Sequence, residues 1–325
     1  MALKTDSSGV TSSKKGFLER LFGNRRELNT NLTLLSMASP GIILLFIFAY
    51  LPMLGIVIAF KDYRFNLGIL GSEWVGFENF RFLFGTDAAF RITRNTLLMN
   101  LAFIATTTIC ALIVAILMNE VYRSRMSKYY QTMLFFPYFI SWVIVSYFVF
   151  AFLNGQTGLL NQWMEVWGIE ERIAWYRSPG YWPLILILAN LWNGIGFSSI
   201  IYLAGILGIS PELFEAAQID GANKLQQIRH ITLPLLTPMI LILILLAIGR
   251  IFHADFGLFF FLPRGNPLLY PTTDVIDTFV YRSLVELGEI SMAAAAGFYQ
   301  SFVGFLLVVG ANWVVRRFNE DYALY

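Results

Sequence analysis

The stretch Thr96–Met118, TLLMNLAFIATTTICALIVAILM, contains no Asp, Glu, Lys or Arg. A run of about 20 predominantly apolar residues is long enough for an α-helix to cross the hydrocarbon core of a bilayer. Similar runs recur, and we expect transmembrane helices at 34–60, 96–118, 133–153, 182–207, 235–262 and 293–315. A β-barrel would instead show alternating strands of about 10 residues. The sequence therefore predicts an all-α membrane protein with six transmembrane helices.

The composition agrees with this fold class. Of the 325 residues, 57% are hydrophobic and 14% are charged, against roughly 25% charged in a soluble domain. The net charge of +2 is too small to indicate nucleic-acid binding. Cys110 is the single cysteine, which excludes an internal disulfide. The first apolar run is too long for a signal peptide, and we interpret it as an uncleaved membrane helix.

Lys and Arg residues in the loops predict the orientation, because cytoplasmic loops carry an excess of both. They occur in the amino-terminal segment, in the loops after the second and fourth helices, and in the tail. We assign these four regions to the cytoplasm, which places both termini there. The first outer loop runs against the rule, since it contains Lys61, Arg64, Arg81, Arg91 and Arg94.

We expect four segments along the chain. They are a cytoplasmic amino-terminal segment, a first membrane helix with its outer loop, a membrane core, and a cytoplasmic tail, at 1–33, 34–95, 96–315 and 316–325. The core includes a cytoplasmic loop at 210–234. The first segment includes a short interfacial helix, whose apolar face is formed by Phe17, Leu18, Leu21 and Phe22.

The loop contains EAAQIDGANKLQQIRHITLP, residues Glu215–Pro234, and has clear helix punctuation. Ser210 can cap a helix, Pro211 fits its first position, and Gly221 suits a left-handed stop. A second helix then continues toward the fifth membrane helix. The pattern predicts a helix-turn-helix outside the bilayer.

This segment resembles the EAA loop of permease subunits in binding-protein-dependent ABC importers. The family pattern is Glu-Ala-Ala, three residues, Gly, nine residues, Ile, one residue and Leu-Pro. Every spacing is met here, by Glu215, Ala216, Ala217, Gly221, Ile231, Leu233 and Pro234. The extended form PELFEAAQIDGA, which includes Asp220, resembles the carbohydrate-uptake branch. The segments YLPMLGIVIAFKDY and FENFRFLF are similar to permeases for oligo- or polysaccharides.

The resemblance implies a mechanism and a set of partners. The loop would sit in a groove of a cytoplasmic ATPase, so that ATP-driven closure reorients the membrane helices. Glu215 would contact the ATPase, Ala216 and Ala217 would allow close packing, and Gly221 would set the bend. The implied assembly contains a second permease subunit, two ATP-binding subunits and an external solute-binding protein. It would lie in a bacterial cytoplasmic membrane and import an oligo- or polysaccharide. The alternative is an ordinary cytoplasmic helical hairpin.

We expect no catalytic or metal-binding residues in this chain. The sequence lacks the G-x-x-x-x-G-K-[ST] loop that cradles phosphates. His230 and His253 are the only histidines, and no metal-ligand cluster is apparent. We therefore expect a transport subunit without a bound cofactor, with ATP and magnesium held by the partner ATPases.

Two groups of polar residues are candidates for the substrate path. The first, in GRIFHADFG near the middle of the fifth predicted helix, is Arg250, His253 and Asp255. Charged groups in a membrane should face protein or water, either around substrate or as an internal ion pair. The second is Asn190, Asn193 and Phe197, on one face of the fourth predicted helix. Amides suit hydroxyl-rich ligands, but they also serve close helix packing.

Two other functions remain open at this level. One is an ion-coupled secondary transporter in which Arg250 and Asp255 form a charged relay. The other is an ABC permease for a solute that is not a sugar. The EAA spacing and the scarcity of buried carboxylates argue against the first. Arg250 and His253 would suit a uronic acid, although the sequence leaves the acidity of the substrate open.

Overall fold

The computed structural model describes residues 25–122 and 125–318, and the chain forms two units, Met1–Val57 and Ile58–Tyr325. The apolar face predicted at residues 17–22 and the tail beyond residue 318 lie outside the described residues. Five described helices are long and apolar enough to cross a membrane, and a bent helix pair brings the number to six. The predicted all-α fold with six membrane helices is confirmed.

The first span covers Thr30–Phe60, as predicted, and most of it belongs to the first unit. It consists of an α-helix, a π-helical turn and a 3₁₀ helix: α2 (Arg25–Leu45), η1 (Phe46–Tyr50) and η2 (Leu51–Phe60). The π-helical turn ends two residues before Pro52, whose missing N–H disturbs regular α-helical bonding. Large apolar side chains of this span are exposed, Phe48 by 75%. Such a surface suits lipid or another membrane subunit.

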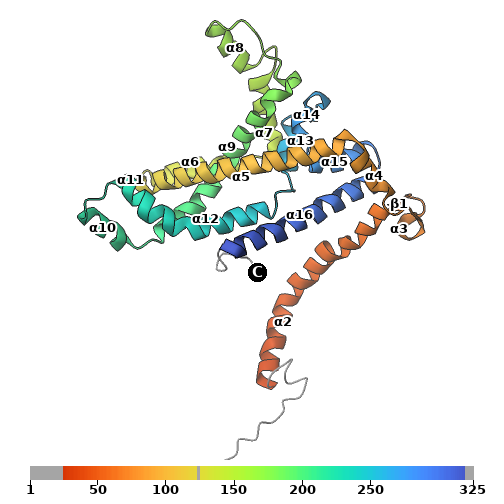
Figure 1. Ribbon diagram of the computed structural model, residues 1–325, viewed down its shortest axis with the longest axis horizontal. Coiled ribbons are helices and arrows are strands. Elements are labelled where there is room, and N and C mark those ends of the chain that lie inside the picture. The colour runs from red at the N-terminus through yellow and green to blue at the C-terminus, as the bar shows by residue number, and fades with distance from the viewer. Residues whose placement is uncertain (1–24, 123–124, 319–325) are drawn as a thin grey trace, which may run out of the picture. The chain divides into compact units, whose positions relative to one another are not determined.

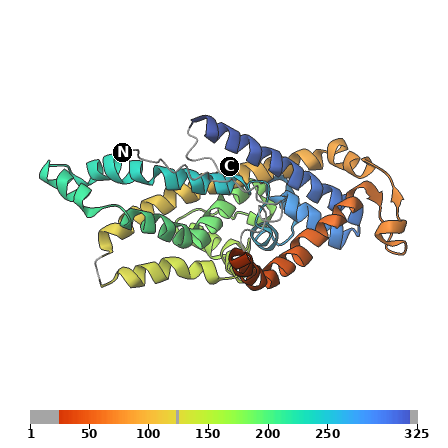
Figure 2. The same cartoon turned by 90° about the horizontal axis from the view of Figure 1, so that it is seen from below.

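Short elements open the second unit. The strands β1 (Lys61–Asp62) and β2 (Glu73–Trp74) pair antiparallel around α3 (Gly68–Gly71), and α4 (Glu78–Gly85) follows. They lie at one end of this unit, opposite the end that carries the loop at 210–234 (Figures 1 and 2).

The long helix α5 (Asp87–Val121) connects these two ends (Figure 1). It contributes buried side chains to all three apolar clusters of the unit: Ile92 to the first, Met99 and Phe103 to the second, Ala111 and Ala115 to the third. Its most extensive helix contact is with α9 (Trp182–Leu207). Burial along its whole length makes α5 the structural axis of the second unit.

The third span is broken, which corrects the prediction of one helix at 133–153. It consists of α6 (Ser127–Phe135), η3 (Phe136–Phe139) and α7 (Trp142–Leu153), and its two halves meet at 96°. Pro137 removes one backbone donor at the bend. The carbonyl of Pro137 accepts a hydrogen bond of 2.9 Å from Asn193 Nδ2 on α9. Gly196 brings α9 against this bend, since a Cβ there would lie 1.9 Å from Leu134 O.

The fifth span is also displaced from its predicted position, 235–262. A continuous helical segment runs over Lys224–Ile248, through α11 (Lys224–Gln227), the π-helical turn η6 (Ile228–Thr232) and α12 (Leu233–Ile248). It ends before Arg250, and α13 (Phe256–Phe261) starts only after a turn. Arg250, His253 and Asp255 therefore lie in a helix break and not in the middle of a helix.

The remaining elements complete the second unit. A short helix precedes α9, a second short helix follows it, and one long span comes last among the described elements, after several turns. These elements are α8 (Leu159–Val166), η4 (Trp175–Arg177), η5 (Pro179–Tyr181), α10 (Pro211–Ile219), η7 (Pro267–Leu269), α14 (Tyr270–Thr273), α15 (Ile276–Tyr281), η8 (Arg282–Glu286) and α16 (Ile290–Phe318).

Candidate coupling loop and translocation path

The loop at 210–234 folds into the predicted helix-turn-helix, α10 followed by α11. Gly221 has φ +82°, which confirms the predicted left-handed stop. Ala222 N donates to Ala217 O at 2.8 Å and Gly221 N to Gln218 O at 3.1 Å, the two bonds of a Schellman motif. A Cβ on Gly221 would meet no heavy atom within 4 Å. Backbone conformation alone therefore selects glycine at this position.

Helix caps on the two sides of the turn differ. Asn223 Oδ1 accepts from Gln226 N at 2.9 Å, and Gln226 Oε1 accepts from Asn223 N at 2.8 Å. This reciprocal capping box starts α11 and was missed in the sequence, where the Asn-x-x-Gln spacing signals it. Pro211 occupies the first turn of α10 as predicted, but the Ser210 side chain forms no capping bond.

The residues predicted for coupling present a mostly exposed surface. No residue of α10 is buried. Among the candidates, three are partly buried, Ala217, Ile231 and Leu233, and five are exposed, Glu215, Ala216, Asp220, Gly221 and Pro234. A short helix with so little cover from its own chain is suited to contact another protein.

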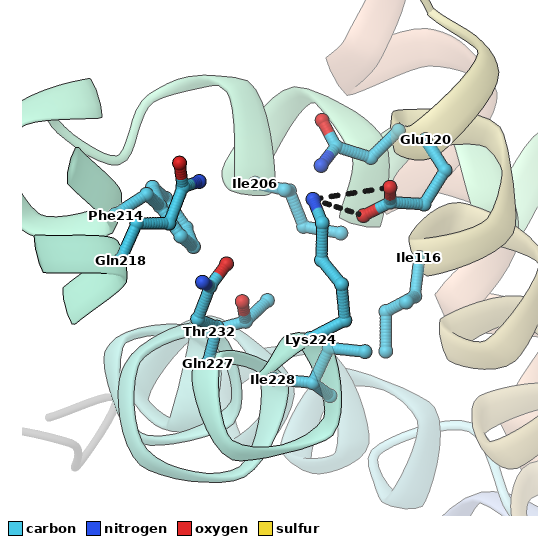
Figure 3. Close-up of a pocket in the computed structure, with 10 residues that line it drawn as sticks. Ile116, Glu120, Ile206, Phe214, Gln218, Lys224, Gln227, Ile228 and Thr232 are labelled. Carbon is cyan, nitrogen blue, oxygen red and sulfur yellow. Dashed lines mark hydrogen bonds and ion pairs between the residues drawn. The ribbon is translucent and has the colours of Figure 1, made fainter. Parts of the chain in front are cut away.

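One ion pair ties this loop to α5. Lys224 Nζ lies 3.2 Å from Glu120 Oε1 and 3.1 Å from Glu120 Oε2, so the ammonium group contacts both carboxylate oxygens. A cavity of about 100 Å³ lies beside the pair, between α5, α10 and α11 (Figure 3). Phe214 and Gln218 line it from α10. Helices α10 and α5 thus line the same cavity beside this ion pair.

The break before α13 is held by side chains from other helices. Asn100 Nδ2 of α5 donates to Ile251 O at 2.8 Å, and Gln300 Nε2 of α16 donates to Phe252 O at 2.7 Å. Asp277 Oδ2 of α15 accepts from Ala254 N at 2.8 Å and from Gln300 Nε2 at 3.0 Å. Backbone groups freed by a break need such partners in a membrane.

The two helix breaks are joined to each other, and we call residues 139–142 and 249–255 the junction. Trp142 Nε1, at the start of α7, donates to Asp255 Oδ2 at 2.7 Å. Asp255 Oδ1 accepts from Leu258 N at 3.2 Å and caps α13. Both carboxylate oxygens of Asp255 are therefore engaged within the chain, as expected of a helix-end anchor.

Arg250 and His253 differ from Asp255. All three residues are exposed, but within the described residues the side chains of Arg250 and His253 form neither a hydrogen bond nor an ion pair. On α9, Asn190 Nδ2 lies 3.4 Å from Thr107 Oγ1, while Asn193 binds the third-span bend as described above. Phe197 is 42% exposed and stacks on Tyr138, with ring centroids 5.0 Å apart and planes at 12°. The two amides thus serve helix contacts, whereas Phe197, Arg250 and His253 remain accessible.

Several residues that organise these sites were missed in the sequence. Asn100 and Gln300 are polar residues inside long apolar runs, which is a detectable signal for a buried functional or structural contact. Asp274 is fully buried at the opposite end of the second unit from the loop, and it pairs with Arg91 at 3.2 Å and Arg282 at 3.0 Å. Arg91, predicted to lie in the first outer loop, therefore lies in α5 and is neutralised within the fold.

Comparison with known proteins identifies the family. Residues 107–320 match the model of the family described as binding-protein-dependent transport system inner membrane component. The chain belongs to this family. It is a membrane-spanning transport subunit that works with a substrate-binding protein, and it is not an enzyme.

Relatives and solved structures agree with this assignment. The polygalacturonan/rhamnogalacturonan transport system permease protein YteP of Bacillus subtilis (strain 168) is 38% identical, over 88% of each chain. The crystal structure of a bacterial ABC transporter involved in the import of the acidic polysaccharide alginate contains a similar chain. The two share 34% identity with a TM-score of 0.82, over 93% of this chain and 100% of that one. A chain in the complex of the alginate transporter with a periplasmic protein bound to alginate pentasaccharide is also similar. It matches with a TM-score of 0.81 and 34% identity, over 90% of this chain and 97% of that one.

Proposed function

We propose that this chain is a permease subunit of an ABC importer that carries an acidic oligo- or polysaccharide across the bacterial cytoplasmic membrane. The single observation that carries the proposal is the exposed EAA helix α10, stopped by Gly221, in a family member with six spans. A second permease subunit and two ATP-binding subunits complete the importer, and ATP with magnesium is bound by the latter. Both termini and the coupling loop lie in the cytoplasm.

The loop residues have distinct parts in this proposal. Glu215 contacts the ATPase, and Ala216 and Ala217 allow its groove to approach. Asp220 and Gly221 form the turn, and Ile231, Leu233 and Pro234 join the loop to α12. The exposure of α10 and the continuity of α11 with α12 support this division of roles.

The substrate path is proposed to follow the accessible polar and aromatic groups near the junction. Arg250 and His253 offer positive charge or hydrogen-bond donors to a uronate carboxylate. Phe197 and Tyr138 offer stacked aromatic faces to sugar rings. Broken helices line the transport path in other transporters, because their backbone is tolerated only beside protein or a water-filled cavity. Asn190 and Asn193 hold the helices beside this path, and Asp255 anchors Trp142 and the start of α13.

Uptake into liposomes that contain the complete importer tests the proposal. We expect ATP-dependent uptake of tritium-labelled trigalacturonate in the presence of the binding protein, with competition by alginate oligomers and none by maltotriose. Uptake of maltotriose without uptake of trigalacturonate would show that the substrate is not acidic. Uptake that needs an ion gradient and no ATP would favour the ion-coupled transporter instead.

A further inference from the structure

The ion pair between Glu120 and Lys224 has an unusual placement. Glu120 lies in the last turn of α5, and Lys224 is the first residue of the segment Lys224–Ile248. A helix carries partial negative charge at its carboxyl end and partial positive charge at its amino end. Each residue therefore has the unfavourable sign for its own helix. Their direct contact beside the cavity lets each charge offset the unfavourable sign of the other (Figure 3).

The connections between the loop and the membrane helices show which helices a movement of the loop can reach. The chain itself joins the loop to α9 and to α12, which pack on α5 through apolar side chains. Within the described residues, Lys224–Glu120 is the one ion pair between the loop and α5. Backbone contacts between α10 and the other described elements are sparse. The pair is therefore the charged link from the coupling loop to α5.

Helix α5 can carry a displacement to the junction. About 20 residues separate Glu120 from Asn100, which corresponds to about 30 Å along a helix. At that distance Asn100 holds the carbonyl of Ile251 in the junction, and Asn95 Nδ2 holds Asp274 O at 3.0 Å. The helix is packed in three apolar clusters, so it moves as a body and does not bend freely.

We propose that Glu120 and Lys224 are positioning residues that transmit movement of the coupling loop through α5 to the junction. This inference rests on the proposed function, because it assumes that an ATPase moves the loop. Side chains of the pair are 45% and 66% exposed, so their role is to fix the direction of movement and not to stabilise the fold.

The test uses the reconstituted complete importer and measures ATPase capture and sugar taken up per ATP hydrolysed. The probe is tritium-labelled trigalacturonate, or an alginate trimer if that is the sugar taken up. Variants are Glu120→Gln, Lys224→Gln, the double variant, and the charge exchange Glu120→Lys with Lys224→Glu. Glu78→Gln is the matched control, because Glu78 forms an exposed ion pair with Arg81 at 3.1 Å on α4.

We expect normal ATPase capture by all variants and a threefold to fivefold lower transport ratio for each single variant. A fivefold change corresponds to about 1 kcal/mol, within the range of an exposed ion pair. The double variant should be no worse than the singles, and the charge exchange should recover within about twofold. Glu120→Gln alone removes an unfavourable charge from the end of α5, yet it should still lower the ratio.

The outcomes separate this inference from the function on which it rests. A wild type that captures no ATPase overturns both. If each single variant has the wild-type transport ratio, only the inference is overturned. The inference is also overturned if the fold-loss of transport ratio in the double variant equals the product of the two single fold-losses, because the two residues then act independently. Losses of equal size in Glu78→Gln would show a general effect of removing surface charge and would also overturn it.

Discussion

The loop at 210–234, the proposed coupling loop, and the junction are both departures from regular membrane helices, but they are built in opposite ways. The loop takes its shape from local contacts, a Schellman motif and a capping box, and leaves α10 exposed. The junction takes its shape from contacts distant in sequence, such as Asn100 with Ile251 and Gln300 with Phe252. A surface for a partner needs a locally stable shape, whereas a break inside a membrane needs partners for its freed backbone groups.

Substitution of Gly221 should give the largest effect and should affect the loop alone. Gly221→Val forces a β-branched residue into a left-handed conformation, so we expect at least tenfold less uptake and weak ATPase capture in detergent. Gly221→Asn tolerates this conformation and should stay near wild type. Membrane insertion and thermal stability should be unchanged in both. Full capture by the valine variant would show that this turn is dispensable for coupling.

Substitution of Gln300 should lower stability and leave ATPase capture unchanged, which is the reverse of the expectation for Gly221. Gln300→Met leaves Phe252 O without its donor and removes one donor to Asp277, with little change in volume. We expect a loss of about 1–2 kcal/mol in stability, read as a lower melting temperature in detergent. ATPase capture should be as in wild type. Loss of capture with normal melting would contradict the separation of the two regions.

Arg250 tests whether the accessible side of the junction serves transport and not stability. Arg250→Ala should lower trigalacturonate uptake by about fivefold, which is about 1 kcal/mol of lost interaction with a carboxylate. The melting temperature should not change, because the side chain is exposed and makes no described polar contact. Arg250→Lys should retain part of the uptake. Wild-type uptake by the alanine variant would remove Arg250 from the path.

The smallest effect should come from the Glu165–Arg172 ion pair of α8 and its loop, which belongs to neither region. The hydrogen bond from Arg172 lowers the pKa of Glu165. The stability that the ion pair contributes is therefore fully present at a pH above the ordinary glutamate pKa of about 4.3. It is lost as the pH falls through the lower pKa of Glu165 in the folded protein. Arg172→Gln should lower the melting temperature slightly at pH 6, and by less at a pH below the folded pKa of Glu165. An equal difference at both pH values would exclude this pair as the cause.

The sequence predicted well where a short pattern decides the structure. Apolar runs of membrane length placed six spans, and Glu215–Pro234 predicted the helix-turn-helix with its left-handed Gly221. The prediction from sequence was wrong where a membrane span is bent or interrupted. Pro137 in 133–153 and the polar residues at 250–255 in 235–262 allow a break at those positions, but they do not require one, because the partners that hold each break come from other helices. For the same reason Asp255 was grouped with Arg250, although only Asp255 has partners within the chain.

The sequence by itself determined the fold class and the helix-turn-helix shape of the loop at 210–234, because span length and turn conformation depend on residues close together in the chain. Only the tertiary structure decided where the membrane helices break and which polar groups remain accessible. Those features depend on Asn100, Asp277 and Gln300, which come from three different helices. A backbone break in a membrane is stable only when such distant partners satisfy it, and their meeting is a property of the folded chain.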